Sequence, residues 1–133
     1  MEEMTLKQWT IFFVKNKDIL KNSLQGYEDK ENPLVFKFSD KIHKYLVLDA
    51  LDDSVFPFIK ESDFKSVVCK AKNENLKFLI DNWNSFKDVE YLDFVFADVV
   101  SNKRWIINPK IHSRICDEDS LVLGLKTMYD NSF

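Results

Sequence analysis

The sequence predicts an α/β (α+β) fold, a single domain over residues 1–133 with a mixed five-stranded sheet and helices on both faces. Two segments, 44–50 and 91–100, are apolar at consecutive positions, which is typical of strands covered on both sides. Three other segments carry apolar residues at helical spacing. A length of 133 residues is close to the usual size of one domain.

The elements are predicted in the order helix, three strands, helix, two strands, helix. Thr5 and Gln8 form a capping-box pattern for a first helix, which Gly26 ends. The strands are expected at 34–39, 44–50, 64–71, 91–100 and 104–108, with 27–33 as a polar connector. Asn73 and Asp117 are the expected caps of the second and third helices. The second helix should pack on the sheet through Leu76, Leu79, Ile80 and Trp83.

Composition excludes several classes of protein. The chain is 45% hydrophobic and 14% aromatic, which is too apolar for a disordered protein. It has only two glycines, so the glycine-rich phosphate loops of common nucleotide-binding motifs are missing. No apolar run approaches the roughly 20 residues that span a bilayer, so no membrane partner is expected. Cys69 and Cys116 lie far apart and form no short-range pair, which favours a reducing cytoplasm.

Acidic residues between two predicted strands form the first candidate site. Asp49 ends one strand, and Asp63 and Lys65 open the next. Two carboxylates that converge from adjacent strands can hold Mg²⁺, and a lysine can stabilise a phosphoryl transition state. The element order over residues 5–100 resembles the PD-(D/E)xK nuclease family. That resemblance implies catalytic roles for Asp49, Asp63 and Lys65, with the metal held by the two aspartates. The alternative is that all three are solvated residues at strand ends.

A basic segment forms the second candidate site. Residues 99–116 contain no acid, but they include both arginines of the chain. Arginine binds phosphate or carboxylate through two parallel hydrogen bonds, and tryptophan can stack on a base. The predicted anion-binding residues are Lys103, Arg104, Trp105, Lys110 and Arg114. The alternative is a solvated hairpin edge, where basic residues discourage aggregation.

Two further groups of residues are candidates for a site. His43, His112, Cys69 and Cys116 show no spacing typical of a zinc site. The apolar run 55–59 is predicted to be a loop that either tucks under the sheet or stays exposed as a partner site.

Together these patterns favour a small non-catalytic interaction or regulatory domain in the cytoplasm, without a cofactor. Opposite charges on the segments 49–63 and 99–116 favour self-association as a homodimer. Nucleic acid is only weakly indicated as a partner, because the net charge is −3. The alternative is a metal-dependent nuclease, or a degenerate relative, that uses Mg²⁺.

Overall fold

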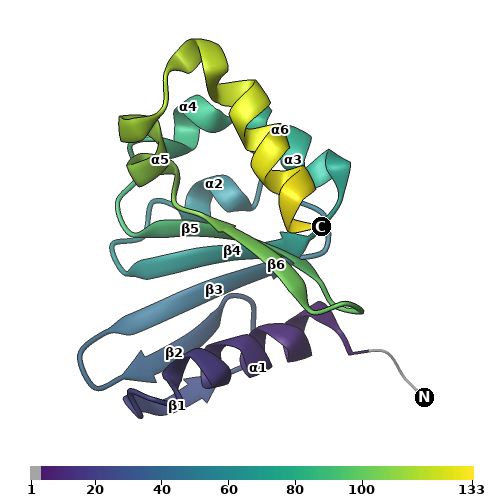
Figure 1. The fold of residues 1–133 in the computed structure, drawn as a ribbon. Coiled ribbons are helices and arrows are strands. Elements are labelled where there is room, and N and C mark those ends of the chain that lie inside the picture. The colour runs from purple at the N-terminus through teal and green to yellow at the C-terminus, as the bar shows by residue number, and fades with distance from the viewer. Residues whose placement is uncertain (1–3) are drawn as a thin grey trace.

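A computed structural model describes residues 4–133, which form an α/β domain built on one mixed sheet (Figure 1). The sheet has six strands in the spatial order β1-β2-β3-β4-β5-β6, so every strand lies beside its neighbours in sequence. Helix α1 covers one face of the sheet, and the remaining helices gather on the other face. Helices on both faces are therefore confirmed, and the number of strands is one more than expected.

The bounds of the elements fix the architecture. The helices are α1 Leu6–Asp18, α2 Val55–Phe58, α3 Asn73–Asp81, α4 Trp83–Phe86, α5 Pro109–Ile115 and α6 Leu121–Ser132, with a 3₁₀ turn at Glu118–Ser120. The strands are β1 Leu24–Glu28, β2 Leu34–Phe38, β3 Ile42–Leu48, β4 Phe64–Lys70, β5 Leu92–Asp98 and β6 Lys103–Ile107.

The directions of the strands follow from their connections. Strands β1, β2 and β3 form an antiparallel meander, because short turns join them. Strands β3, β4 and β5 run parallel, because helices on a single face of the sheet connect them. The last strand, β6, returns antiparallel to β5 through a tight hairpin.

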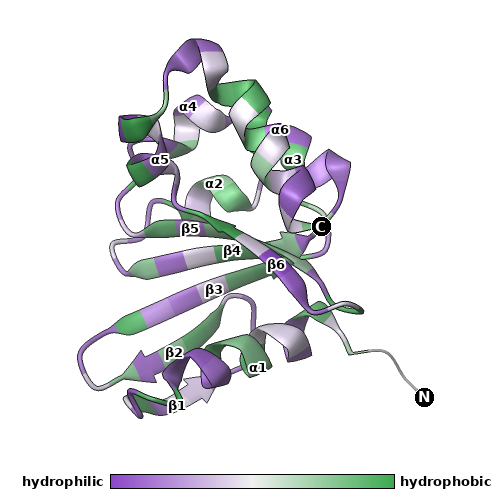
Figure 2. Ribbon diagram, in the orientation of Figure 1, coloured by the Kyte–Doolittle hydropathy of each residue, from purple (hydrophilic) through white to green (hydrophobic). Residues whose placement is uncertain are grey.

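Two hydrophobic cores lie on the two faces of the sheet. The core beneath α1 includes Trp9, Phe13 and Phe36, all buried. The larger core holds Phe94 and Phe96 beneath the other helices. Figure 2 shows the apolar colour along the central strands, and also on α5 and the start of α6. The predicted stripe of the second helix is confirmed, since its four residues all contribute to the larger core.

Strand β1 is the one strand that the sequence patterns missed. The sequence predicts that the first helix continues to Gly26 and that a polar connector follows, but residues 24–28 pair with β2. Helix α1 ends at Asp18, whose carboxylate accepts hydrogen bonds from the backbone N–H groups of Ser23 and Leu24. These bonds turn the chain into the edge strand. Ile19 and Leu20, which follow the end of α1, are exposed.

Helix ends account for most other differences from the predicted elements. Lys72, not Asn73, occupies the cap of α3, and Asp117 makes no side-chain cap bond. Helix α5 is not among the predicted elements. It is capped by Asn108, whose side-chain oxygen accepts a hydrogen bond from the Ile111 N–H. The run 55–59 forms the short helix α2 and its end, and it tucks against the larger core. Over residues 4–133, no helix is long and apolar enough to cross a bilayer.

Candidate functional site

The two aspartates of the predicted metal site lie at opposite ends of the sheet. Strands β3 and β4 run parallel with Leu48 beside Cys69, so Asp49 leaves the sheet where β4 ends. Asp63 precedes the start of β4. The seven residues of β4 separate the two positions, and a rise of about 3.3 Å per residue puts them roughly 20 Å apart. One metal ion cannot bridge such a gap.

Each of these acids is paired with a nearby lysine. Asp49 lies 3.5 Å from the ammonium of Lys70, and Asp63 lies 3.4 Å from that of Lys44. Lys65 is buried and donates to the backbone carbonyls of Asp63 and Glu90. Burial lowers the pKa of its ammonium. Within the described part of the chain, no group of three or more His, Cys, Asp or Glu side chains is arranged to hold a metal. The site implied by the nuclease resemblance is therefore not assembled.

The residues of the predicted basic site also separate. Trp105 is buried in the larger core, with its ring centre 5.2 Å from that of Phe96. Strand alternation puts Lys103 on the same face as Trp105 and Arg104 on the opposite one. Trp105 therefore offers no open ring for a base to stack on.

The other two members lie on α5. Lys110 forms an ion pair of 2.9 Å with Glu90, and this contact lowers the pKa of the Glu90 carboxyl. Arg114 is exposed near the end of that helix. Of the five residues, only Arg104 faces α1.

On the face of the sheet that α1 covers, a row of polar side chains crosses the central strands. Tyr45 of β3 lies beside Ser66 of β4, and Ser66 lies beside Asp93 of β5. His43 is two residues before Tyr45 and therefore points to the same face. Its Nε2 atom is 2.8 Å from the Ser66 hydroxyl. Apart from Asp93, which is half-buried, these side chains are buried.

Burial dominates the electrostatics of this row. It lowers the pKa of His43 to about 3, and the nearby Lys17, Lys41 and Lys65 add to the shift. The imidazole is therefore neutral at physiological pH. Burial also raises the pKa of Asp93, although Lys17 and a hydrogen bond with Asn108 oppose that change.

Ser66 is a structural member of the row. Its hydroxyl bonds to His43, so it satisfies a buried polar group of that ring. Its side chain does not line a hollow, whereas His43 and Tyr45 do. The row forms the polar floor of the hollow that His43 and Tyr45 line.

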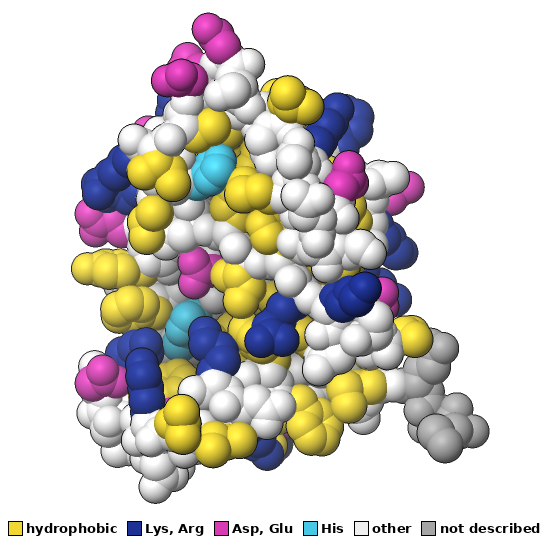
Figure 3. Space-filling model, in the orientation of Figure 1, with side chains coloured by type: hydrophobic (Ala, Val, Ile, Leu, Met, Phe, Trp, Pro, Cys, Tyr) yellow, Lys and Arg dark blue, Asp and Glu magenta, His cyan; other side chains and the backbone are white. Residues whose placement is uncertain are grey.

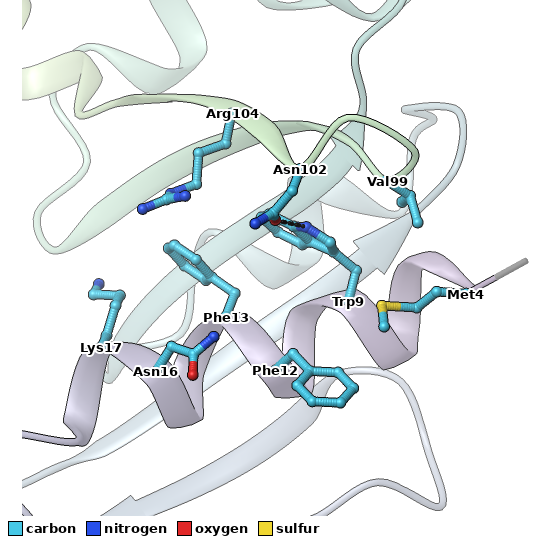
Figure 4. A pocket seen from close by; sticks show the side chains of 9 residues that line it. All are labelled: Met4, Trp9, Phe12, Phe13, Asn16, Lys17, Val99, Asn102 and Arg104. Carbon is cyan, nitrogen blue, oxygen red and sulfur yellow. Dashed lines mark hydrogen bonds between the residues drawn. The ribbon is translucent and has the colours of Figure 1, made fainter.

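Two cations lie against one aromatic ring above that floor. The Lys17 ammonium lies 5.1 Å from the centre of the Phe13 ring, and the Arg104 guanidinium lies 5.2 Å from it. Figure 4 shows both charged ends reaching toward the same side of Phe13. Neither cation takes part in any ion pair found in residues 4–133. Desolvation lowers the pKa of Lys17, and repulsion from Arg104 and two lysines contributes.

Two hollows meet at Lys17, and we call them together the α1 cleft. The aromatic hollow, of about 390 Å³, is lined by Trp9, Phe12, Phe13, Asn16, Asn102 and Arg104, among others. The basic hollow, of about 270 Å³, is lined by Lys17, Lys21, Lys41, His43 and Tyr45, together with Asp18 and Asp40. Figure 3 shows Lys and Arg side chains gathered on the surface beside α1.

The acids in the basic hollow neutralise only part of this charge. Asp18 is held by hydrogen bonds from Ser23 and Leu24, which lower the pKa of its carboxyl. Asp93 lies close enough to act on Lys17 and Lys41, without forming an ion pair with either. The cleft is therefore a positively charged region on a chain of net charge −3.

Sequence reasoning placed Arg104 in a binding site but missed the rest of the cleft. A signal was present: His43, Ser66 and Asp93 are polar residues on the inner faces of otherwise apolar strands. Only the sheet register shows that they lie side by side.

The chain matches no protein-family model, no curated protein and no solved structure.

Proposed function

We propose that this protein is a non-catalytic interaction domain that binds an anionic group of its partner in the α1 cleft. The observation that carries the proposal is the pair Lys17 and Arg104, two cations set against one phenyl ring without a carboxylate partner among the described residues. Lys41 adds a third cation at the other end of the cleft.

The arrangement suits an external anion. Like charges close together repel each other, and a bound anion between them would replace that repulsion with two attractions. Arginine can present two parallel N–H donors to a phosphate or carboxylate, while lysine acts as a point charge. Neutral His43 can add a hydrogen bond without adding charge.

Non-catalytic binding fits the chemistry of the floor. The Ser66 hydroxyl is buried and lines neither hollow of the cleft, so a substrate bound there does not reach it. Asp49 and Asp63 lie at opposite ends of β4, which separates the acids that metal-dependent hydrolysis needs.

Self-association in a reducing cytoplasm is the second part of the proposal. Since the cleft is positive and the net charge is −3, the remaining surface carries excess negative charge that a second copy can present to the cleft. Cys69 is buried and Cys116 is half-buried, and both are free thiols, which suits a reducing compartment.

The test is a titration with inorganic phosphate at low ionic strength, followed by NMR. We expect saturable shifts of α1 and β6 resonances in the wild type, and their loss in Lys17→Gln, Arg104→Gln. The matched control is the double variant Lys7→Gln, Lys103→Gln, which keeps Lys17 and Arg104. It removes the same charge from α1 and β6, but outside the cleft. Equal shifts in both double variants, or no shift in the wild type, would overturn the proposal.

A further inference from the structure

We infer that the anion recognised by the α1 cleft is the phosphate of a nucleotide whose base sits in the aromatic hollow. The inference rests on the proposed function, because it uses Lys17 and Arg104 as the phosphate-binding pair. It adds a second subsite and a ligand class. A free nucleotide and the end of a single strand share this chemistry.

The aromatic hollow offers a surface on which a base can stack. Trp9 and Phe13 stack on each other with ring centres 5.1 Å apart, and they form its buried wall. Phe12 projects from the same helix and keeps 56% of its surface exposed. Figure 4 shows the Phe12 ring on the side of α1 away from Arg104, while Trp9 and Phe13 point toward Asn102 and Arg104. An exposed ring beside a polar pocket is the kind of group on which bases stack, without regard to their identity.

Two side-chain amides supply hydrogen bonds in the same hollow. The Asn102 carbonyl oxygen accepts a bond of 2.8 Å from the Trp9 indole N–H, which fixes the orientation of that amide. Its NH₂ group is left for another acceptor. Asn102 lies in the turn before β6, in the left-handed region at φ 59°. Asn16 lines the hollow from α1. Amides of this kind both donate to and accept from the edges of bases.

The order of the groups along the cleft matches the order of groups in a nucleotide. The aromatic hollow leads to Arg104 and Lys17, and Lys17 opens into the basic hollow with Lys41. A base, a sugar and a phosphate would meet these groups in that sequence. The volumes of the two hollows together are in the range of small-molecule sites, roughly 300–1,000 Å³.

An acidic peptide would also satisfy the cations. It would gain little from the exposed Phe12 ring and the two amides, because a carboxylate needs neither a stacking surface nor a base-reading group. A nucleotide would use the cations through its phosphate, and the Phe12 ring and the two amides through its base.

The test compares five probes by calorimetry at low salt: inorganic phosphate, ribose 5-phosphate, adenosine monophosphate, a single-stranded trinucleotide and an acidic peptide. We expect adenosine monophosphate to bind about tenfold more tightly than ribose 5-phosphate, the scale of one base stacked on an aromatic ring. Phe12→Ala should remove that margin and leave phosphate affinity unchanged. Leu123→Ala, an exposed apolar residue on α6, is the matched control and should change neither affinity.

The outcomes separate this inference from the proposed function. If phosphate binds, but the sugar phosphate and the nucleotide bind equally, the nucleotide inference is wrong and the anion site stands. If an acidic peptide competes better than the nucleotide, the ligand class is a peptide and the inference is likewise overturned. If no phosphate probe binds, both fail. Tighter binding of the trinucleotide identifies a single strand as the source, and equal binding identifies a free nucleotide. Equal melting temperatures of the two variants show that the fold is intact.

Discussion

The Nε2 atom of His43 lies 2.8 Å from the hydroxyl oxygen of Ser66, on the buried face of two parallel strands. The contact joins β3 to β4 through side chains, in addition to their backbone ladder. It also holds a histidine in a position where protonation is costly, because the ring is buried and three lysines lie nearby. The floor of the α1 cleft is therefore sensitive to acid.

Acidification should destabilise the protein through His43. Its pKa is about 3 in the folded protein against the usual 6.5, so the unfolded chain takes up the proton first. Stability is present in full above pH 6.5 and is lost as the pH falls toward 3, by up to about 1.4 kcal/mol per pH unit. Chemical denaturation of the wild type and of His43→Gln at several pH values measures the difference.

The comparison with His43→Gln isolates this residue from the other titrating groups. Asp93 works in the opposite direction, since its pKa is raised, but both proteins contain it. If the two proteins lose stability in parallel between pH 6.5 and 4, His43 is accessible to solvent and the buried arrangement is wrong.

Replacing Asp93 by asparagine should strengthen anion binding. Its carboxylate acts on both Lys17 and Lys41, so it competes with a bound anion for their charge. We expect phosphate affinity to rise several-fold in Asp93→Asn, and the effect to shrink as added salt screens the charges. Asp98→Asn, in the same strand but outside both hollows, is the control. A decrease in affinity would show that Asp93 positions the lysines instead of opposing the ligand.

Trp83→Ala should cost about 3–5 kcal/mol in the free energy of unfolding, the usual scale for a large buried aromatic side chain. Trp83 is 5% exposed and belongs to the larger core. Urea denaturation measures the change, with Leu123→Ala as an exposed reference. An unchanged midpoint for Trp83→Ala would show that α4 does not pack on the sheet.

Millimolar Mg²⁺ should leave the melting temperature unchanged. Metal bound only to the folded state stabilises it by mass action, but Asp49 and Asp63 lie too far apart to share an ion. Thermal melts with and without Mg²⁺, repeated on Asp49→Asn, Asp63→Asn, test this point. A rise in the wild type that the double variant lacks would restore the metal site.

Self-association should weaken as salt is added, because it is expected to join a positive cleft to a negative surface. Sedimentation velocity at low and high ionic strength measures it. Lys17→Gln, Arg104→Gln should be monomeric where the wild type associates. A dimer that survives high salt, or that the double variant retains, would point to a different interface.

Local patterns in the sequence determined most of the elements, because hydrophobic periodicity and capping are local. The capping box of Thr5 and Gln8 is present as predicted, and the stripe of the last helix, with Leu125 and Tyr129 buried, lies against the larger core. The predicted strands from β2 to β6 are all present. Where a tertiary contact decided the outcome, local patterns failed. Leu24 continues the helical spacing, yet it is in β1, because the Asp18 carboxylate and the β2 edge capture the backbone that follows α1.

The candidate site depended almost wholly on tertiary structure. Its cations come from α1, from the turn before β3 and from β6, and nothing in their local sequence links Lys17 to Arg104. The pair that sequence reasoning did link, Asp49 and Asp63, are close along the chain but separated by the length of β4, because a parallel connection must return to the start of the sheet before the next strand begins. Composition and periodicity therefore determined an α/β domain with an apolar sheet covered on both faces. The register and direction of the strands decided which charged side chains meet.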